Sequence, residues 1–125
     1  MTLTTVLNPF GRALDEGLNL NEVLGDDPIA GSAHLDRLCQ LTASDCASAP
    51  DGIRYRLVGA DPRFCTPMQY GGFYLERDRE ILAQAKQQGY IEIDVDGDEP
   101  YLDFIVDLPC DSLAHNGRKI EVTHA

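Results

Sequence analysis

The chain has 125 residues, of which 43% are hydrophobic and 25% are charged, and its formal net charge at pH 7 is −11. This length fits one domain with a single core, and the balance of apolar and charged residues excludes a wholly disordered chain. A sequence pI near 4.4 argues against direct binding of nucleic acid or an anionic membrane, because phosphate groups are bound by Lys and Arg. We therefore expect one domain over residues 1–125 that binds neither.

The N-terminal residues indicate a compartment, and the compartment predicts the state of the cysteines. The first residues lack the basic and apolar regions of a secretory signal, and no run approaches the roughly 18 apolar residues that a membrane span needs. We expect a cytoplasmic protein, in which cysteines are kept reduced. The four cysteines are Cys39, Cys46, Cys65 and Cys110.

In chain order, the first expected elements are helical. Residues 2–25 have a weak helical pattern that Pro9 and two glycines interrupt. Asp27 and Pro28 suit the N-cap and first position of a helix, and the apolar spacing that follows predicts this helix to about Ala43. Its apolar stripe should face the core.

The middle of the chain predicts a strand, a loop and a second helix. Residues 53–58 alternate with period two, which predicts a strand with Arg54 and Arg56 on one face. Residues 59–73 are rich in Gly and Pro and predict a long loop, and loops of this length are often functional. Residues 74–88 place apolar side chains on one side of a helix and charged side chains on the other.

The last third predicts a β-hairpin. Residues 91–95 alternate apolar with acidic side chains, and the alternation resumes over residues 101–108 after a turn. An Asn116-Gly117 turn precedes a last short strand over residues 119–123. The expected fold is α+β, with a small antiparallel sheet of three to four strands and two to three helices packed on one face.

Acidic residues are concentrated in this hairpin. Residues 87–117 hold eight carboxylates and no Lys or Arg. Like charges across paired strands repel each other, so we expect a partner or an ion to offset them. The residues predicted to bind that partner are Glu92, Asp94, Asp96, Asp98, Asp103 and Asp107.

The hairpin suggests a function. Two acidic strands present roughly one charge per 3.4 Å, which is similar to the phosphate spacing along one DNA strand. We predict a non-enzymatic protein that binds a basic protein partner through this face, as an inhibitor or nucleic-acid mimic of the anti-defence or immunity type. The alternative without a partner is a solvated face that Arg54 and Arg56 of a neighbouring strand partly neutralise.

As an alternative to partner binding, the chain could be a small cytosolic enzyme or a divalent-metal-binding protein, with its site in the 59–73 loop or the 94–99 turn. In the loop, Cys65 could act as a nucleophile with His115 or His34 as its base. The turn resembles the start of a calcium loop, but Glu99 stands where an EF-hand has its Gly, and Ile105 stands where it has its final carboxylate.

The sequence assigns no catalytic residue, no metal ligand and no cofactor. It also leaves open a homodimer that forms through an exposed apolar patch.

Overall fold

The computed structural model describes residues 2–115 and 118–120. It contains one five-stranded sheet in the order β1-β2-β3-β4-β5. Strands β1 to β4 run parallel to their neighbours, and β5 pairs antiparallel with β4. The fold is α+β with a mixed, mostly parallel sheet. The strands are β1 (Thr4–Leu7), β2 (Ile53–Leu57), β3 (Ile91–Val95), β4 (Ser112–His115) and β5 (Arg118–Ile120).

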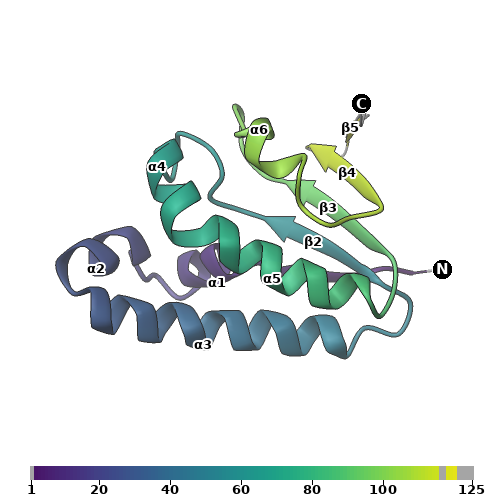
Figure 1. Ribbon diagram of the computed structural model, residues 1–125, viewed down its shortest axis with the longest axis horizontal. Coiled ribbons are helices and arrows are strands. Elements are labelled where there is room, and N and C mark those ends of the chain that lie inside the picture. The colour runs from purple at the N-terminus through teal and green to yellow at the C-terminus, as the bar shows by residue number, and fades with distance from the viewer. Residues whose placement is uncertain (1, 116–117, 121–125) are drawn as a thin grey trace.

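Helices fill the connections between the parallel strands, because such strands need a crossover to run in the same direction. Crossovers of one hand that step in one direction leave their helices on one face of the sheet. Figure 1 shows the two long helices, α3 and α5, side by side over that face. The helical elements are α1 (Pro9–Asp15), α2 (Leu20–Asp26), α3 (Pro28–Ala47), α4 (Pro67–Gln69), the π-helical turn η1 (Tyr70–Tyr74), α5 (Leu75–Lys86) and α6 (Leu102–Ile105).

The expected antiparallel sheet of three to four strands is wrong, and so is the acidic β-hairpin. Strand β3 is the first half of that hairpin, but residues 101–108 contain helix α6 where the second strand was expected. Leu102, Ile105 and Val106 have the i, i+3, i+4 spacing of a helix, so this short run fitted both patterns. The backbone N–H of Val106 donates to the Leu102 carbonyl at 2.9 Å, as in a helix.

The two ends of the chain also differ from expectation. Residues 2–25 hold strand β1 in addition to helices α1 and α2. Strand β1 has four residues, of which only Val6 is buried, so it leaves no alternating pattern in the sequence. The predicted turn at residues 116–117 and the end of the predicted strand 119–123 lie outside the described residues.

The middle elements are confirmed with small shifts of their ends. The helix expected from Pro28 to about Ala43 continues to Ala47. Asp27 caps its start by accepting a hydrogen bond from the Ala30 N–H at 3.2 Å. The strand over 53–58 and the helix over 74–88 correspond to β2 and α5. The loop over 59–73 is partly helical, since α4 and most of η1 lie within it.

The core lies between the sheet and helices α3 and α5. Ile53, Tyr55 and Leu57 of β2 are buried against these helices, while Arg54 and Arg56 point to the opposite face. None of the described helices covers that opposite face (Figure 1). The sheet therefore has one apolar face and one face that carries charge.

Two further expectations concern membranes and cysteines. In the part of the chain that the structure describes, none of the helices combines the length and the apolar character that crossing a bilayer requires. Cys39, Cys46, Cys65 and Cys110 are not joined by disulfides, and their reduced state stays a prediction.

Candidate functional site

The loops that follow the parallel strands meet at one edge of the sheet, because parallel strands end on the same side. The 94–99 turn and the start of the 59–73 loop lie against each other there. The backbone N–H of Tyr101, just after the turn, donates to the Ala60 carbonyl at 2.8 Å. The short helices α4 and α6 lie near this end of the sheet (Figure 1). Two regions that the sequence offered as separate sites therefore form one edge.

Gly97 packs closely against the Asp61 side chain at this edge. Gly97 has a φ of +117°, which disfavours residues with a side chain. A β-carbon at position 97 would collide with the Asp61 carboxylate. Glycine therefore allows the turn to pack directly against a buried acidic side chain.

The open face of the sheet carries a charge ladder, formed by Arg54 and Arg56 of β2 with Glu92, Asp94 and Asp96 on and after β3. Arg54 lies opposite Glu92 and Arg56 opposite Asp94, and both pairs have N–O distances of 2.5 Å. Arg56 also lies 3.8 Å from Asp96. Three of the six predicted partner-binding carboxylates are thus paired with arginines of the neighbouring strand, as the solvated-face alternative expected.

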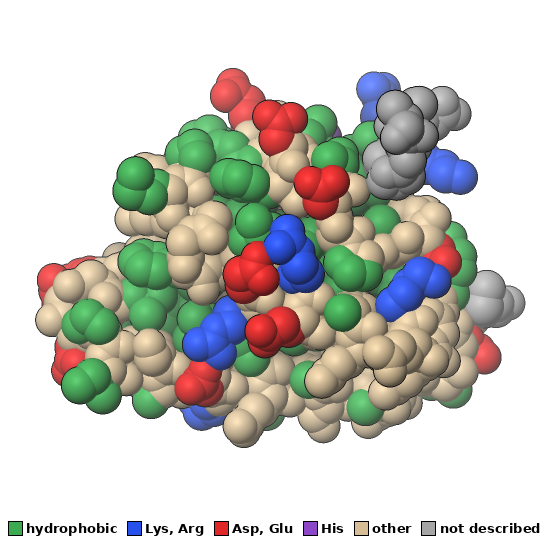
Figure 2. Space-filling model, viewed as in Figure 1, with side chains coloured by type: hydrophobic (Ala, Val, Ile, Leu, Met, Phe, Trp, Pro, Cys, Tyr) green, Lys and Arg blue, Asp and Glu red, His purple; other side chains and the backbone are tan. Residues whose placement is uncertain are grey.

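The other three predicted residues, Asp98, Asp103 and Asp107, lie on the segment that follows β3 and includes α6. Together with Glu99 they form the acidic segment, and all four are exposed. Eight of the ten Lys and Arg residues pair with other carboxylates, and no described residue forms an ion pair with the acidic segment. Figure 2 shows acidic side chains standing out at the top of the molecule, over α6.

Exposed apolar side chains lie on the elements around the acidic segment. Helix α6 packs on η1, with the rings of Phe104 and Tyr70 6.3 Å apart. Leu102 of α6 is 39% exposed, Phe73 of η1 is 36% exposed and Met68 of α4 is 85% exposed. Aromatic residues and Met are enriched in protein interfaces, and Phe73 and Met68 are of these types.

A pocket of about 220 Å³ opens beside the acidic segment, and we call it the Asp61 pocket. Its lining is Asp61, Pro62, Arg63, Asp98 and Glu99. Asp61 is only 1% exposed. Burial raises the pKa of its carboxyl, while the positive charge of Arg63 and a hydrogen bond from the Asp98 backbone act to lower it. Asp61 Oδ2 lies 3.5 Å from Arg63 Nε, whereas Oδ1 has no hydrogen-bond partner among the described residues.

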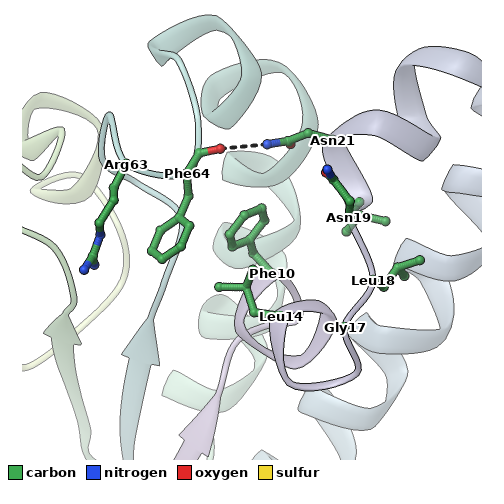
Figure 3. A pocket seen from close by; sticks show the side chains of 9 residues that line it. Phe10, Leu14, Gly17, Leu18, Asn19, Asn21, Arg63 and Phe64 are labelled. Carbon is green, nitrogen blue, oxygen red and sulfur yellow. Dashed lines mark hydrogen bonds between the residues drawn. The ribbon is translucent and has the colours of Figure 1, made fainter.

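A second pocket, of about 370 Å³, lies on the other side of Arg63. Figure 3 shows Phe10 and Phe64 next to each other in its lining, with ring centroids 5.7 Å apart. Asn21 fixes the Phe64 backbone by donating from Nδ2 to its carbonyl at 2.8 Å. Leu14 adds an exposed apolar side chain to the lining. Five of its lining residues are apolar, namely Phe10, Leu14, Leu18, Leu20 and Phe64, whereas Pro62 is the one apolar residue that lines the Asp61 pocket.

Cys65 is a poor candidate for a catalytic nucleophile. It is 2% exposed, and burial raises its pKa to about 11. The thiol is therefore protonated at neutral pH, and the thiolate is the reactive form. The sheet also lacks the reversal of strand order at which open parallel sheets usually form a ligand crevice. The buried, protonated thiol weighs against Cys65 as the nucleophile of the enzyme alternative.

The metal alternative has no ligand set in the structure. Within residues 2–115 and 118–120, no group of three or more His, Cys, Asp or Glu side chains is placed to hold a metal ion. In the 94–99 turn, Asp94 and Asp96 pair with Arg56. Arg56 therefore offsets the charge of the two carboxylates that the sequence hypothesis assigned to a divalent ion.

Sequence reasoning missed Asp61 and did not include Glu99 in the predicted set. Both belong to regions that the sequence singled out, the 59–73 loop and the 94–99 turn. A signal for Asp61 was its position just after a predicted strand. That signal has meaning only once the strands are known to be parallel, because their carboxyl ends then meet.

Comparisons of the chain with protein-family models, with curated proteins and with solved structures found no match.

Proposed function

We propose that this chain is a non-enzymatic protein that binds a basic protein partner through the acidic segment and inhibits the partner by covering a basic surface. The observation that supports the proposal most is a difference in ion pairing between the two parts of the acidic stretch over residues 92–107. Glu92, Asp94 and Asp96 have arginine partners within the chain. Asp98, Glu99, Asp103 and Asp107 have exposed charges that are available to another molecule.

The apolar side chains around the acidic segment add to this proposal. Charge steers a partner and sets its orientation, whereas most of the binding free energy comes from a few buried apolar or aromatic contacts. Leu102, Phe73 and Met68 are large and exposed, and they lie on elements at the same edge. A partner with a basic rim around an apolar contact would match both features.

Nucleic-acid mimicry loses its original support. The phosphate-like spacing depended on two paired acidic strands, and one of those strands is helix α6. The four unpaired carboxylates lie on a turn and a short helix, so no regular spacing is expected. A basic protein that is not selected for phosphate spacing fits this surface better.

The test compares two variants that have the same net charge. In the first, Asp98, Asp103 and Asp107 are replaced by Lys. In the second, Asp26, Asp51 and Glu80, which are also exposed, are replaced by Lys. Proteins captured by the wild type from a lysate are identified, produced in pure form, and titrated calorimetrically against all three proteins at low and moderate salt.

We expect a basic partner whose affinity falls at least about tenfold for the first variant, which corresponds to about 1.4 kcal/mol. The second variant should lose less than about threefold, and salt should weaken wild-type binding. Equal losses for both variants would show that only net charge matters. No loss for either variant would exclude the acidic segment as the binding surface.

A further inference from the structure

The Asp61 carboxylate has acceptor capacity that the structure leaves unused. Asp61 is 1% exposed, and its Oδ1 atom has no hydrogen-bond partner among the described residues. Buried polar atoms in folded proteins almost always have a partner, so an unpaired carboxylate oxygen calls for an explanation. Gly97 packs against this carboxylate, which restricts how the side chain can move.

The surroundings of Asp61 favour a cation. The pocket of about 220 Å³ is lined by three carboxylates, those of Asp61, Asp98 and Glu99, and by a single cation, Arg63. Asp98 and Glu99 are exposed and form no ion pair with a described residue. The negative charge of the lining therefore exceeds what Arg63 can neutralise.

The guanidinium of Arg63 lies beside Asp61 and indicates the kind of group that this carboxylate can bind. The guanidinium lies 3.5 Å from Asp61 and 3.5 Å from Asp96, and it stacks over the Phe64 ring with 4.6 Å from Cζ to the centroid. Half of the side chain is exposed, so it can be displaced from Asp61. It would keep Asp96 and Phe64 as partners after such a displacement.

An organic cation fits this pocket better than a metal ion. Calcium takes six to eight oxygen ligands and magnesium needs near-ideal octahedral geometry. The described residues contain no group of three or more acidic, His or Cys side chains arranged for a metal. A guanidinium or ammonium group needs fewer acceptors and tolerates looser geometry, and a carboxylate can accept two parallel hydrogen bonds from a guanidinium.

We propose that the Asp61 pocket binds the guanidinium or ammonium group of one Arg or Lys side chain of the partner, with Asp61 as the buried acceptor and Asp98 and Glu99 at the rim. This inference rests on the proposed function, because it assigns to the basic partner one side chain that anchors it. Arg63 competes with that side chain for Asp61.

The test uses small probes that do not require the partner to be known. Butylguanidinium and butylammonium are titrated into the ¹⁵N-labelled protein at pH 7.5, with N-butylurea as a neutral analogue of similar shape. Backbone amide shifts of Arg63, Asp98 and Glu99 report on the pocket. Asp61→Asn removes the buried charge, and Asp107→Asn removes one charge of the acidic segment outside the pocket.

We expect saturable shifts with both cations and none with N-butylurea. The dissociation constant should rise at least about fivefold in Asp61→Asn and change less than about twofold in Asp107→Asn. Arg63→Ala removes the competing cation, so it should bind butylguanidinium more tightly. The higher affinity of Arg63→Ala for butylguanidinium provides the test if Asp61→Asn fails to fold. Shifts that do not saturate, that persist in Asp61→Asn, or that weaken in Arg63→Ala would overturn the proposal.

The outcome for the pocket is separate from the outcome for the surface. If partner binding depends on Asp103 and Asp107 while the pocket takes up neither cation, the proposed function stands and the pocket assignment falls. If the pocket binds butylguanidinium while partner binding ignores the acidic segment, the proposed function falls and the pocket is a site for small organic cations.

Discussion

The charge ladder and the acidic segment have similar composition but different surroundings. In the ladder, Glu92 and Asp94 meet Arg54 and Arg56, which lie 38 residues earlier in the chain. In the acidic segment, Asp98 and Asp107 form no ion pair with any described residue. The function of a carboxylate in this protein is therefore set by the strand next to it and cannot be inferred from local acidity.

Burial increases the contrast between the two regions. The Asp94 side chain is 12% exposed, so its charge has lost most of its contact with water. Its Oδ1 atom has no hydrogen-bond partner among the described residues, which leaves Arg56 as the main compensation. Ladder carboxylates should therefore matter for stability, and acidic-segment carboxylates should matter for binding.

The largest expected effect comes from Arg56→Met, which keeps the aliphatic stem but leaves Asp94 without its cation. Removing one partner of a largely buried pair leaves an uncompensated charge. We expect the free energy of unfolding, measured by urea denaturation, to fall by about 3 kcal/mol. Arg37→Met is the control, because the Arg37–Glu16 pair is exposed on both sides and such pairs contribute about 0–1 kcal/mol. Equal effects would break the distinction between ladder and surface pairs.

Asp78 differs from the carboxylates of both regions, because it is buried and its hydrogen-bond donors are neutral groups. It lies in the core on α5 and accepts hydrogen bonds from the Tyr55 hydroxyl at 2.6 Å and the Tyr70 hydroxyl at 2.7 Å. The Asn8 amide lies 3.4 Å from both of its oxygens. Desolvation raises its pKa to about 6 in spite of these donors.

The raised pKa predicts how stability changes with pH. The folded protein binds the Asp78 proton more tightly than the unfolded chain, whose reference pKa is 3.8. The stability that this group contributes is fully present below pH 3.8 and is lost as the pH rises through about 6. Relative to Asp78→Asn, the wild type should lose about 2 kcal/mol of unfolding free energy between pH 4 and pH 7. A difference that stays constant over this range would contradict the prediction.

Sequence patterns predicted the separate elements of this fold better than their pairing. The Asp27-Pro28 start of α3 and the alternation of β2 are local signals, and both elements form. Whether β2 pairs parallel or antiparallel with its neighbours is not a local property, because period-two alternation occurs in both arrangements. The four-residue helix α6 is too short for its apolar spacing to distinguish a helix from a strand.

The candidate site was predictable only in part, for the same reason. The acidic stretch was evident from composition, and Arg54 and Arg56 were named as an alternative source of neutralisation. Which of the carboxylates they reach depends on the register of β2 against β3. The Asp61 pocket forms because the end of β2 lies beside the turn after β3. These two segments would be at opposite edges of the sheet if β2 and β3 were antiparallel.

The smallest expected effect tests the other side of the comparison. A triple variant removes three exposed charges of the acidic segment through Asp98→Asn, Glu99→Gln and Asp107→Asn. Asp103 is kept because it lies in the first turn of α6, where a negative charge is favourable. We expect the unfolding free energy to change by less than about 0.5 kcal/mol, as for most surface substitutions. Any change should be an increase of the unfolding free energy at low salt, because the wild-type carboxylates repel one another most strongly there. This increase should become smaller as salt is added. A loss above about 1 kcal/mol would mean that these carboxylates stabilise the fold as the ladder does, and the acidic segment could then no longer be regarded as a surface kept for a partner.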